Sequence, residues 1–327
     1  MKVLIAGGAG FIGSHLTQKL LENNYQVVCV DNLLTGSEKN ITDFKTNKNF
    51  VFINHDITIP FAFSEKVEAV FHLASPASPN YHSSLSFHTL AMETMLANTL
   101  GTLELLKLAK QIKSKFLFTS TSEVYGDPQV HPQPEIYNGN SSTTGPRSVY
   151  DEAKRFGETL TAHFWRKEGV DARIARIFNT YGPKMLKSDM RMIINFINQA
   201  LEDKPITIYG DGKQTRSLCY VDDMVTGLIK LMFAPNTKAE IVNLGSTDEY
   251  SVLEYAHLVK KITNSKSEIV FEEKLPEDDP KIRRPDITKA KKLLNWEPKY
   301  SLEQGLSETI EWIKNNQDKY KTEIYNI

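Results

Sequence analysis

The feature that most restricts the fold of this chain is its N-terminal stretch, KVLIAGGAGFIGSHL. Residues Lys2 to Ala6 form a short apolar run, which is typical of a buried strand. Gly7, Gly10 and Gly13 follow at once and lead into apolar residues at helical spacing. Glycines here allow a tight turn, a close approach of the backbone to a pyrophosphate, and close packing of helix on strand. The stretch therefore predicts a strand, a phosphate-binding loop and a helix whose N-terminal N–H groups face an anion.

A carboxylate at the end of the second apolar run, QVVCVDN, narrows the choice of cofactor. Asp31 stands roughly 20 residues beyond the glycines, where an acid accepts hydrogen bonds from ribose hydroxyls and repels a 2′-phosphate. The sequence therefore predicts NAD rather than NADP. Asp56 and Ile57 close the third run, FVFINHDI, and are predicted to contact the adenine, with a simple strand terminator as the alternative for both. The loop has no Lys before Ser14, which excludes the mononucleotide-binding P-loop.

Apolar runs alternate with amphipathic segments through the first half of the chain. The runs at 2–7, 26–32, 50–56, 69–75, 115–122 and 171–179 predict strands, and 10–24, 89–112 and 150–168 predict helices. This alternation indicates an α/β fold: a Rossmann-type, doubly wound parallel sheet covered by helices on both faces. We expect residues 1–180 to form the NAD-binding domain, with 222–248 returning to it. Residues 181–221 and 249–327 are expected to form a smaller, interleaved substrate lobe.

The overall composition excludes several classes of protein. The formal net charge is −1 and the isoelectric point is about 6.7, which leaves no field for gathering nucleic acid or anionic lipid. No apolar run approaches the roughly 18 residues of a membrane span, and the N-terminus is predicted to be a strand, not a signal peptide. Cys29 and Cys219 lie far apart among apolar residues, which fits a reducing compartment. We therefore predict a cytoplasmic protein that binds no nucleic acid, membrane or metal.

Two groups of polar residues point to catalysis. The fifth apolar run ends in TSTSEVYG, residues 119–126, with four hydroxyls and a carboxylate where a turn would suffice. In SVYDEAKRF, Tyr150 and Lys154 lie four apart, on one face of the predicted helix. An ammonium beside a phenol favours the phenolate, so we expect a lowered pKa for Tyr150. Such a tyrosine can remove a proton from an alcohol while a hydride leaves the same carbon for a nicotinamide.

The motifs taken together resemble a known family. GGAGFIG, HLAS, STSEVYG and YDEAK are similar to motifs of the extended short-chain dehydrogenase/reductases that act on nucleotide sugars. Within that family, the chain resembles the UDP-glucuronate decarboxylases, which form UDP-xylose, in HLASPASP, TSTSEVYGDPQVHPQ, GPRSVYDEAKR, RIARIFNTYGP, YGDGKQTRSLCYVDD, DDPKIRRPDI and LNWEP. These phrases run from residue 6 to about residue 300. The resemblance implies oxidation at C4 of the sugar, loss of CO2 from the 4-keto intermediate, and re-reduction by the retained NADH.

The resemblance also implies roles for single residues. Tyr150 would be the base, with Lys154 as its electrostatic partner, and Thr121 would bond the C4 oxygen. Ser122 and Glu123 would lie near C5 and its carboxylate. The expected cofactor contacts are Gly7, Gly10, Phe11, Ile12, Gly13, Asp31, Asn32, Thr35, Gly36, Asp56, Ile57, Leu73, Ser75, Tyr150, Lys154 and Thr180. The expected substrate contacts are Asn179, Arg191, Tyr209, Gln214, Arg216 and Arg283.

The resemblance gives three of these residues a more specific role. Arg283, in KIRRPDI, matches the family's arginine that acts in decarboxylation and re-protonation, so it counts as catalytic as well. Arg216 matches a diphosphate-binding arginine, and Tyr209 lies in the strand that would flank the uracil. One stretch departs from the family pattern: residues 81–96 are several residues longer, and Leu96 stands where many relatives carry a Lys that reaches the substrate.

Other activities of the same family, and a role without turnover, are the alternatives. A 4,6-dehydratase carries an acid where this chain has Ser122, and a 4-epimerase typically has a small residue in place of Glu123. A protein that only senses NAD would be expected to have lost Tyr150 or Lys154, and both are present. By the same resemblance we expect a homodimer, in which the helices near 89–112 and 150–168 of two subunits form a four-helix bundle.

Overall fold

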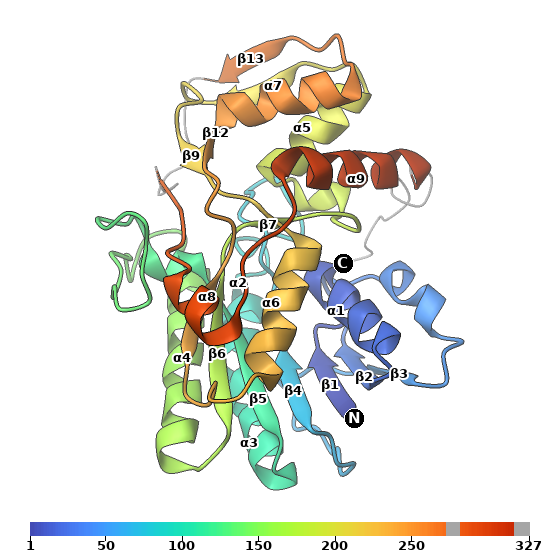
Figure 1. Cartoon of the computed structure of the whole chain (residues 1–327), viewed down its shortest axis with the longest axis vertical. Coiled ribbons are helices and arrows are strands. Elements are labelled where there is room, and N and C mark those ends of the chain that lie inside the picture. Colours follow the sequence, from blue (N-terminus) through green and yellow to red (C-terminus); the bar gives the residue numbers. More distant parts are fainter. Residues whose placement is uncertain (273–281, 317–327) are drawn as a thin grey trace.

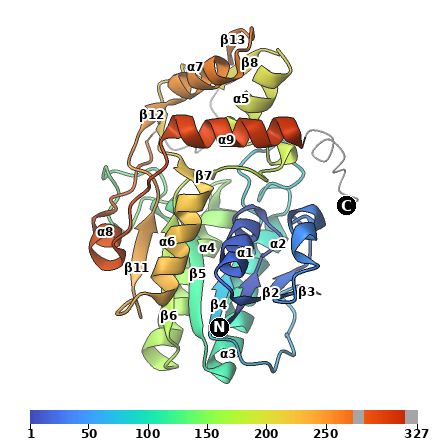
Figure 2. The ribbon, with the colours of Figure 1, turned by 45° about the vertical axis from the view of Figure 1, so that its right-hand side comes forward.

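The structure is a computed structural model that describes residues 1–272 and 282–316. A larger lobe built on a parallel sheet lies below a smaller lobe of helices and short strands (Figures 1 and 2). The sheet of the described residues has the strand order β11-β6-β5-β4-β1-β2-β3, and every neighbouring pair is parallel. Its strands are β1 (Lys2–Ala6), β2 (Gln26–Asp31), β3 (Phe50–Asn54), β4 (Ala69–His72), β5 (Lys115–Thr121), β6 (Ala172–Ile177) and β11 (Ile241–Leu244). The predicted Rossmann-type α/β class is thus confirmed.

Helices cover both faces of the sheet, which explains why its strands are continuously apolar. One face packs on α1 (Phe11–Glu22) and α6 (Val221–Phe233), and the other on α3 (Thr102–Ile112) and α4 (Ser148–Lys167), while α2 (Ala91–Leu96) packs on α4. Side chains alternate between the two cores: Val3 and Ile5 of β1 join one, and Leu4 and Ala6 join the other. Each strand therefore contributes side chains to both cores.

The helix predicted over 89–112 is interrupted. A π-helical turn, Ala97–Gly101, separates α2 from α3. At this turn the backbone lies very close to neighbouring segments. A Cβ on Gly101 would come within 2.7 Å of the Ile57 side chain. A Cβ on Gly157 of α4 would come within 3.0 Å of the carbonyl oxygen of Asn98, which belongs to the turn. Asn98 also donates a 2.8 Å hydrogen bond to the Ser75 hydroxyl at the end of β4. The turn thus ties the helix to the edge of the sheet.

The upper lobe comes mainly from late parts of the chain. It contains α5 (Met192–Leu201), β8 (Ile206–Tyr209), α7 (Val252–Thr263), β13 (Ile269–Glu272) and α9 (Leu302–Asn315), with β8 and β13 paired in parallel. Residues between them return to the sheet, because α6 covers one face and β11 pairs with β6. The helix α8 (Thr288–Leu294) was expected in the smaller lobe. It packs instead on β11 and α6 of the larger lobe, because Ala290 and Leu294 are buried in the sheet core.

Short elements join the two lobes. They are the paired strands β7 (Thr180–Tyr181) and β10 (Cys219–Tyr220), and the pair β9 (Thr215–Arg216) and β12 (Tyr250–Ser251). Short 3-10 turns lie at Glu38–Asn40 and Thr42–Phe44 between β2 and β3, at Ser122–Tyr125 after β5, and at Lys187–Asp189 before α5. Within the described ranges, every helix is too short or too polar to cross a lipid bilayer. The same ranges hold no group of three or more His, Cys, Asp or Glu side chains that could bind a metal ion.

Candidate active site

Two adjoining cavities lie at the carboxyl ends of the sheet strands, where open α/β sheets bind their ligands. The first, of about 730 Å³, is bounded by the ends of β1 to β4 and by α2. The second, of about 1280 Å³, extends from the glycine loop to the ends of β5 and β6, the start of α4 and the segment around residue 189. Gly7, Gly10, Thr35, Leu73 and Ser75 line both, so the two cavities form one continuous site.

The glycine loop is shaped to receive an anion. Gly7 has a positive φ of 82°, and a Cβ on Gly13 would overlap the Gly7 carbonyl oxygen, so this turn requires glycine at both positions. Among the described residues, no side chain caps the first turn of α1 at Gly10, and that turn holds no acid. Its N–H groups are therefore available to a phosphate, as in dinucleotide-binding folds.

Asp31 both supports the loop and faces the first cavity. Its Oδ2 accepts a hydrogen bond from the Ala9 N–H and its Oδ1 one from the Leu33 N–H, each of 2.9 Å. Burial raises the pKa of Asp31, and these two backbone hydrogen bonds oppose the shift. A carboxylate offers about four acceptor positions, so ribose hydroxyls can still be bound. The donor loop, the acid and the continuous cavity together fit NAD.

Every residue predicted to bind the cofactor lines at least one of the two cavities. The first cavity holds Asp31, Asn32, Gly36, Asp56 and Ile57, and the second holds Phe11, Ile12, Gly13, Tyr150, Lys154 and Thr180. Asp56 also has a structural task, because its Oδ1 accepts a 2.8 Å hydrogen bond from the Thr58 N–H. Its two proposed functions, strand terminator and adenine contact, are therefore compatible.

Tyr150 and Lys154 both line the second cavity from α4. Lys154 Nζ donates a 2.8 Å hydrogen bond to the Thr119 carbonyl oxygen and lies 5.7 Å from the centre of the Tyr150 ring. Burial lowers the pKa of Lys154 to about 7, with Glu158 opposing the shift. Burial also raises the pKa of Tyr150 to about 12, with a hydrogen bond to Thr121 opposing it. The expected lowering of the tyrosine pKa is therefore not seen in the cofactor-free chain, because desolvation outweighs the hydrogen bond to Thr121 and the charge of Arg191.

Glu123 is held between two arginines. Arg147 Nη2 lies 2.5 Å from its Oε2, and Arg283 Nη1 pairs with its Oε1. Burial disfavours the carboxylate, but Arg147 and Arg283 outweigh it and hold the pKa of Glu123 at about 2. Asp151, buried on α4 beside this cluster, behaves in the opposite way: burial and then the Glu123 charge raise its pKa to about 8. The cluster thus combines two cations, one carboxylate and one neutral acid.

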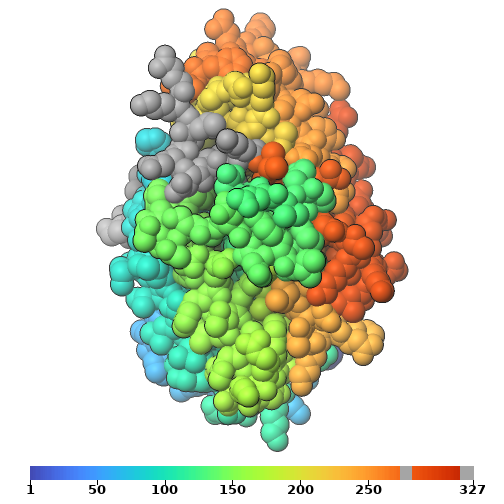
Figure 3. Space-filling view, turned by 90° about the vertical axis from the view of Figure 1, so that its left-hand side faces the viewer, coloured from blue at the N-terminus to red at the C-terminus, as the bar shows by residue number. Residues whose placement is uncertain are grey.

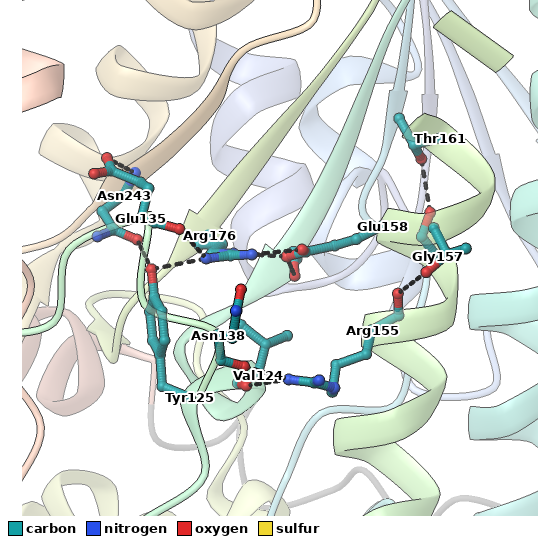
Figure 4. Close-up of polar contacts among 12 residues, drawn as sticks. Val124, Tyr125, Glu135, Asn138, Arg155, Gly157, Glu158, Thr161, Arg176 and Asn243 are labelled. Atoms are coloured by element: carbon teal, nitrogen blue, oxygen red, sulfur yellow. Dashed lines mark hydrogen bonds and ion pairs between the residues drawn. The ribbon is translucent and has the colours of Figure 1, made fainter. Parts of the chain in front are cut away.

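A second buried network supports the strand end that carries Glu123. Ser120 donates a 2.6 Å hydrogen bond to Glu158 Oε1, and Arg176 of β6 contacts both oxygens of the same carboxylate at 2.8 and 2.7 Å. Arg176 also donates to the Tyr125 hydroxyl, which donates to Asn243 Oδ1 of β11 (Figure 4). The hydroxyls of 119–122 therefore serve partly to fix the position of the turn that follows β5.

Some predicted residues lie away from the cavities. Tyr209 is exposed on β8, and Gln214 Nε2 donates to its carbonyl oxygen rather than lining the second cavity. Arg216 on β9 and the buried Ser122 do not line it either. Leu96, which stands where many relatives carry a substrate-reaching Lys, lines the first cavity, on the side of Asp31.

Among the predicted substrate residues, Asn179 and Arg191 line the second cavity, and Arg283 reaches it through Glu123. The sequence reasoning missed Arg147 and Phe87, which also line this cavity. Arg147 stands three residues before Tyr150, one helical turn away, and this spacing is a signal that could have found it. Phe87 lies in the stretch that departs from the family pattern, so no motif marked it.

Comparison with known proteins identifies the family of the chain. The GDP-mannose 4,6-dehydratase family model matches residues 4–309. The chain is 48% identical over 314 residues to UDP-glucuronic acid decarboxylase 1 of Danio rerio, covering 95% of this chain and 72% of the relative. It is also 48% identical over 307 residues to UDP-glucuronic acid decarboxylase 3 of Arabidopsis thaliana, covering 94% of this chain and 87% of that one.

The solved structures that resemble the fold include a related enzyme with its ligands. UDP-glucuronic acid 4-epimerase from Bacillus cereus, in complex with UDP-glucuronic acid and NAD, superimposes with a TM-score of 0.84 at 32% identity. The likeness covers 96% of this chain and 99% of that one. On the extent of the family match and of these similarities, the chain belongs to the GDP-mannose 4,6-dehydratase family, the epimerases and dehydratases of the short-chain dehydrogenase/reductase type.

Proposed function

We propose that this chain decarboxylates UDP-glucuronate to UDP-xylose and retains its NAD throughout the cycle. The observation that carries the proposal is the cluster of Arg147, Glu123 and Arg283 in the same site as Tyr150. Two cations face one carboxylate, so the cluster has a surplus positive charge for a carboxylate on the sugar. The names of the relatives at 48% identity support the same reaction.

Each residue of the site has its own role in the proposed reaction. Bound NAD supplies the hydride acceptor and returns the same hydride. Tyr150 takes the proton of the C4 hydroxyl, Thr121 holds that oxygen, and Lys154 stabilises the phenolate. The C4 ketone makes the sugar a β-keto acid, so the bond to the carboxylate breaks, its electron pair passes into the ketone, and CO2 leaves.

The remaining proton transfers involve the end of the site that holds Glu123. C5 gains a proton from water after CO2 has left, and we assign Glu123 and Arg283 to the positioning of that water, because Glu123 is ionised and has no proton of its own to give. Tyr150 then returns its proton to the C4 oxygen as that carbon is reduced again. Asn179 and Arg191, which line the cavity, are proposed to hold the nucleotide diphosphate. Tyr209, Gln214 and Arg216 remain proposed nucleotide contacts that would require the upper lobe to move towards the sheet.

The test is incubation of the purified protein with NAD and UDP-glucuronate. We expect release of CO2 and formation of UDP-xylose without net production of NADH. UDP-galacturonate as the product would instead indicate a 4-epimerase, and water loss from dTDP-glucose a 4,6-dehydratase. Either result without CO2 release would overturn the proposal.

Two variants separate the proposed steps. Tyr150→Phe should abolish oxidation at C4, a loss of roughly 100- to 10,000-fold for a general base. Glu123→Gln should mainly slow the steps after oxidation, so that NADH accumulates in single-turnover absorbance measurements. Equal loss of the oxidation step in both variants would contradict these roles.

We also propose that two copies of the chain associate through α2, the π turn and α4. Four apolar side chains on these elements are unusually exposed: Met92 (58%), Leu96 (39%), Leu100 (39%) and Phe156 (49%). α4, in light green, reaches the surface on the side shown in Figure 3. Packing this patch on its own copy would complete a four-helix bundle. A cytoplasmic location is a further proposal, supported by the buried free thiols of Cys29 and Cys219.

Sedimentation measures the assembly directly. Phe156→Glu should shift the protein from dimer to monomer, because it places a charge in an apolar interface. Ile136→Glu is the control, since Ile136 is 90% exposed and lies outside the patch. A monomeric unmodified chain at micromolar concentration would refute the proposal.

A further inference from the structure

The segment at residues 76–90 helps to line the second cavity, and its later part overlaps the stretch at 81–96 that departs from the family pattern. Residues 76–90, between β4 and α2, are hydrogen-bonded to residues 188–191. Ser78 Oγ donates to the Asp189 carbonyl oxygen at 2.6 Å, and Asn80 Nδ2 to that of Met190 at 2.8 Å. Arg191 Nη2 donates in turn to the Ala77 carbonyl oxygen at 2.7 Å. These contacts join the two segments in one rigid wall of the cavity.

This wall places an aromatic ring against the proposed base. Phe87 is only 1% exposed, and its ring stacks on that of Tyr150 with centres 4.8 Å apart and planes 10° from parallel. The Arg147 guanidinium carbon lies 5.5 Å from the centre of the Phe87 ring. On the outer side, His88 stacks on Tyr81 with ring centres 3.8 Å apart. Phe87 is thus held between its own segment and α4, with the Tyr150 ring against one face.

We propose that Phe87 is a positioning residue for Tyr150: its ring fixes the orientation of the phenol and keeps water from one face of it. The inference rests on the function proposed above, in which Tyr150 is the base. The Tyr150 side chain can change its rotamer about Cα–Cβ and turn its ring about Cβ–Cγ, and a stacked ring restricts both motions without touching the reacting atoms. A misplacement of about 1 Å at a reacting group can cost roughly 100-fold in rate.

The same contact bears on the proton affinity of Tyr150. Burial is the main reason that its pKa is raised to about 12. The charged or titratable groups around it are Lys154 and Asp151 on α4, Arg147 at the start of α4, Glu123 after β5, Arg191 from the facing segment and His88 next to Phe87. Removing the Phe87 ring leaves the side chains of Lys154, Asp151, Glu123 and Arg191 unchanged, while Arg147 and His88 lose the ring that they contact. Water admitted in its place stabilises the phenolate, so the pKa of Tyr150 should fall.

A plain packing role makes a different prediction, and matched variants separate the two. Phe87→Leu and Phe87→Met both remove the ring, and the flexible methionine is the safer variant for folding. Phe87→Tyr keeps the stacked face. Phe116→Leu is the control, because Phe116 of β5 is also fully buried but packs in the core with α3 and α4. If Phe87 only fills space, its Leu variant should behave like the Phe116 variant.

The experiment measures the pH profile of single-turnover NADH formation. We expect the Leu and Met variants at Phe87 to lose about 10- to 100-fold in rate, with the acid limb moved to lower pH. Phe87→Tyr should have its acid limb at the same pH as the unmodified chain. Phe116→Leu should keep both the rate and the pH of the acid limb unchanged. An unmoved limb in the Leu and Met variants, or the same shift in the Tyr variant, overturns the inference.

A crystal structure of the Phe87→Met protein gives a readout that needs no turnover. We expect the Tyr150 ring to leave its present orientation or to occupy more than one. A Tyr150 ring in its original place overturns the inference even if activity is lost. Failure of the unmodified chain to act on UDP-glucuronate would count against the proposed function alone, because the ring position is tested without substrate.

Discussion

The two ends of the site are built from different kinds of contact. At the cofactor end, Asp31 supports the glycine loop through the Ala9 N–H, 22 positions away, and most donors are backbone groups. At the other end, Glu123 joins Arg147 and Arg283, which are 24 and 160 positions distant, through buried side-chain charges. The first end depends on local backbone shape, and the second on opposite charges that only the complete fold brings together. The two ends should therefore fail in different ways.

The largest effect is expected from Glu123→Gln. Removing the carboxylate leaves two buried arginines facing each other, and breaking a buried ion pair in this way costs about 3–5 kcal/mol of unfolding free energy. Urea unfolding monitored by fluorescence measures this loss. Glu202→Gln is the control: Glu202 also pairs with two cations, Lys187 and Lys204, but lies at the surface, and its loss should change stability little.

The same ion cluster should also appear in the pH dependence of stability. The pKa of Glu123 is lowered from 4.5 to about 2 in the folded chain. Its contribution to stability is therefore complete above about 4.5 and is lost as the pH falls towards 2. The Glu123→Gln protein should lack this part of the acid unfolding curve. An identical acid limb in both proteins would show that the cluster does not form in solution.

At the cofactor end, Gly13→Ala is expected to have the next largest effect. The added Cβ overlaps the Gly7 carbonyl oxygen, and such overpacking costs about 1–3 kcal/mol. Both the unfolding midpoint of the free protein and its affinity for NAD should fall. Gly10→Ala sharpens the comparison, since its Cβ would meet only the Gly7 oxygen at 3.3 Å. It should leave the free protein as stable as before, and an equal loss in both variants would refute this account of the loop.

The effect of Asp151→Asn is expected to be smallest near pH 4 and to grow as the pH rises. The folded chain keeps Asp151 protonated up to about pH 8, whereas the unfolded chain releases that proton near pH 3.8. The folded state therefore binds more protons between these values, and stability falls as the pH rises, by at most about 1.4 kcal/mol per pH unit. Asparagine removes this dependence, so the variant should gain stability relative to the parent as the pH approaches 8. Parallel stability curves for the two proteins would contradict a neutral Asp151.

Sequence reasoning found the fold and the cofactor end of the site because both follow from local patterns. Continuous apolar strands require a sheet covered on both faces, and Gly7 and Gly13 stand where no side chain fits. It was less successful where contacts come from distant segments. Leu96 stands where many relatives carry a Lys that reaches the substrate, yet it lines the first cavity, on the side of Asp31. The tyrosine pKa was expected to fall, and burial raises it instead.

The sequence by itself determined the class of fold, the nucleotide loop and the pair of Tyr150 and Lys154, because each depends on spacing within one strand, turn or helix. Only the tertiary structure decided that Arg147 shares Glu123 with Arg283 and that Phe87 lies on the Tyr150 ring. The reason is physical: a pKa and a ring orientation depend on what surrounds a group in space. Those neighbours come from β5, α4, the segment at 76–90 and the segment after residue 281, which no local pattern relates.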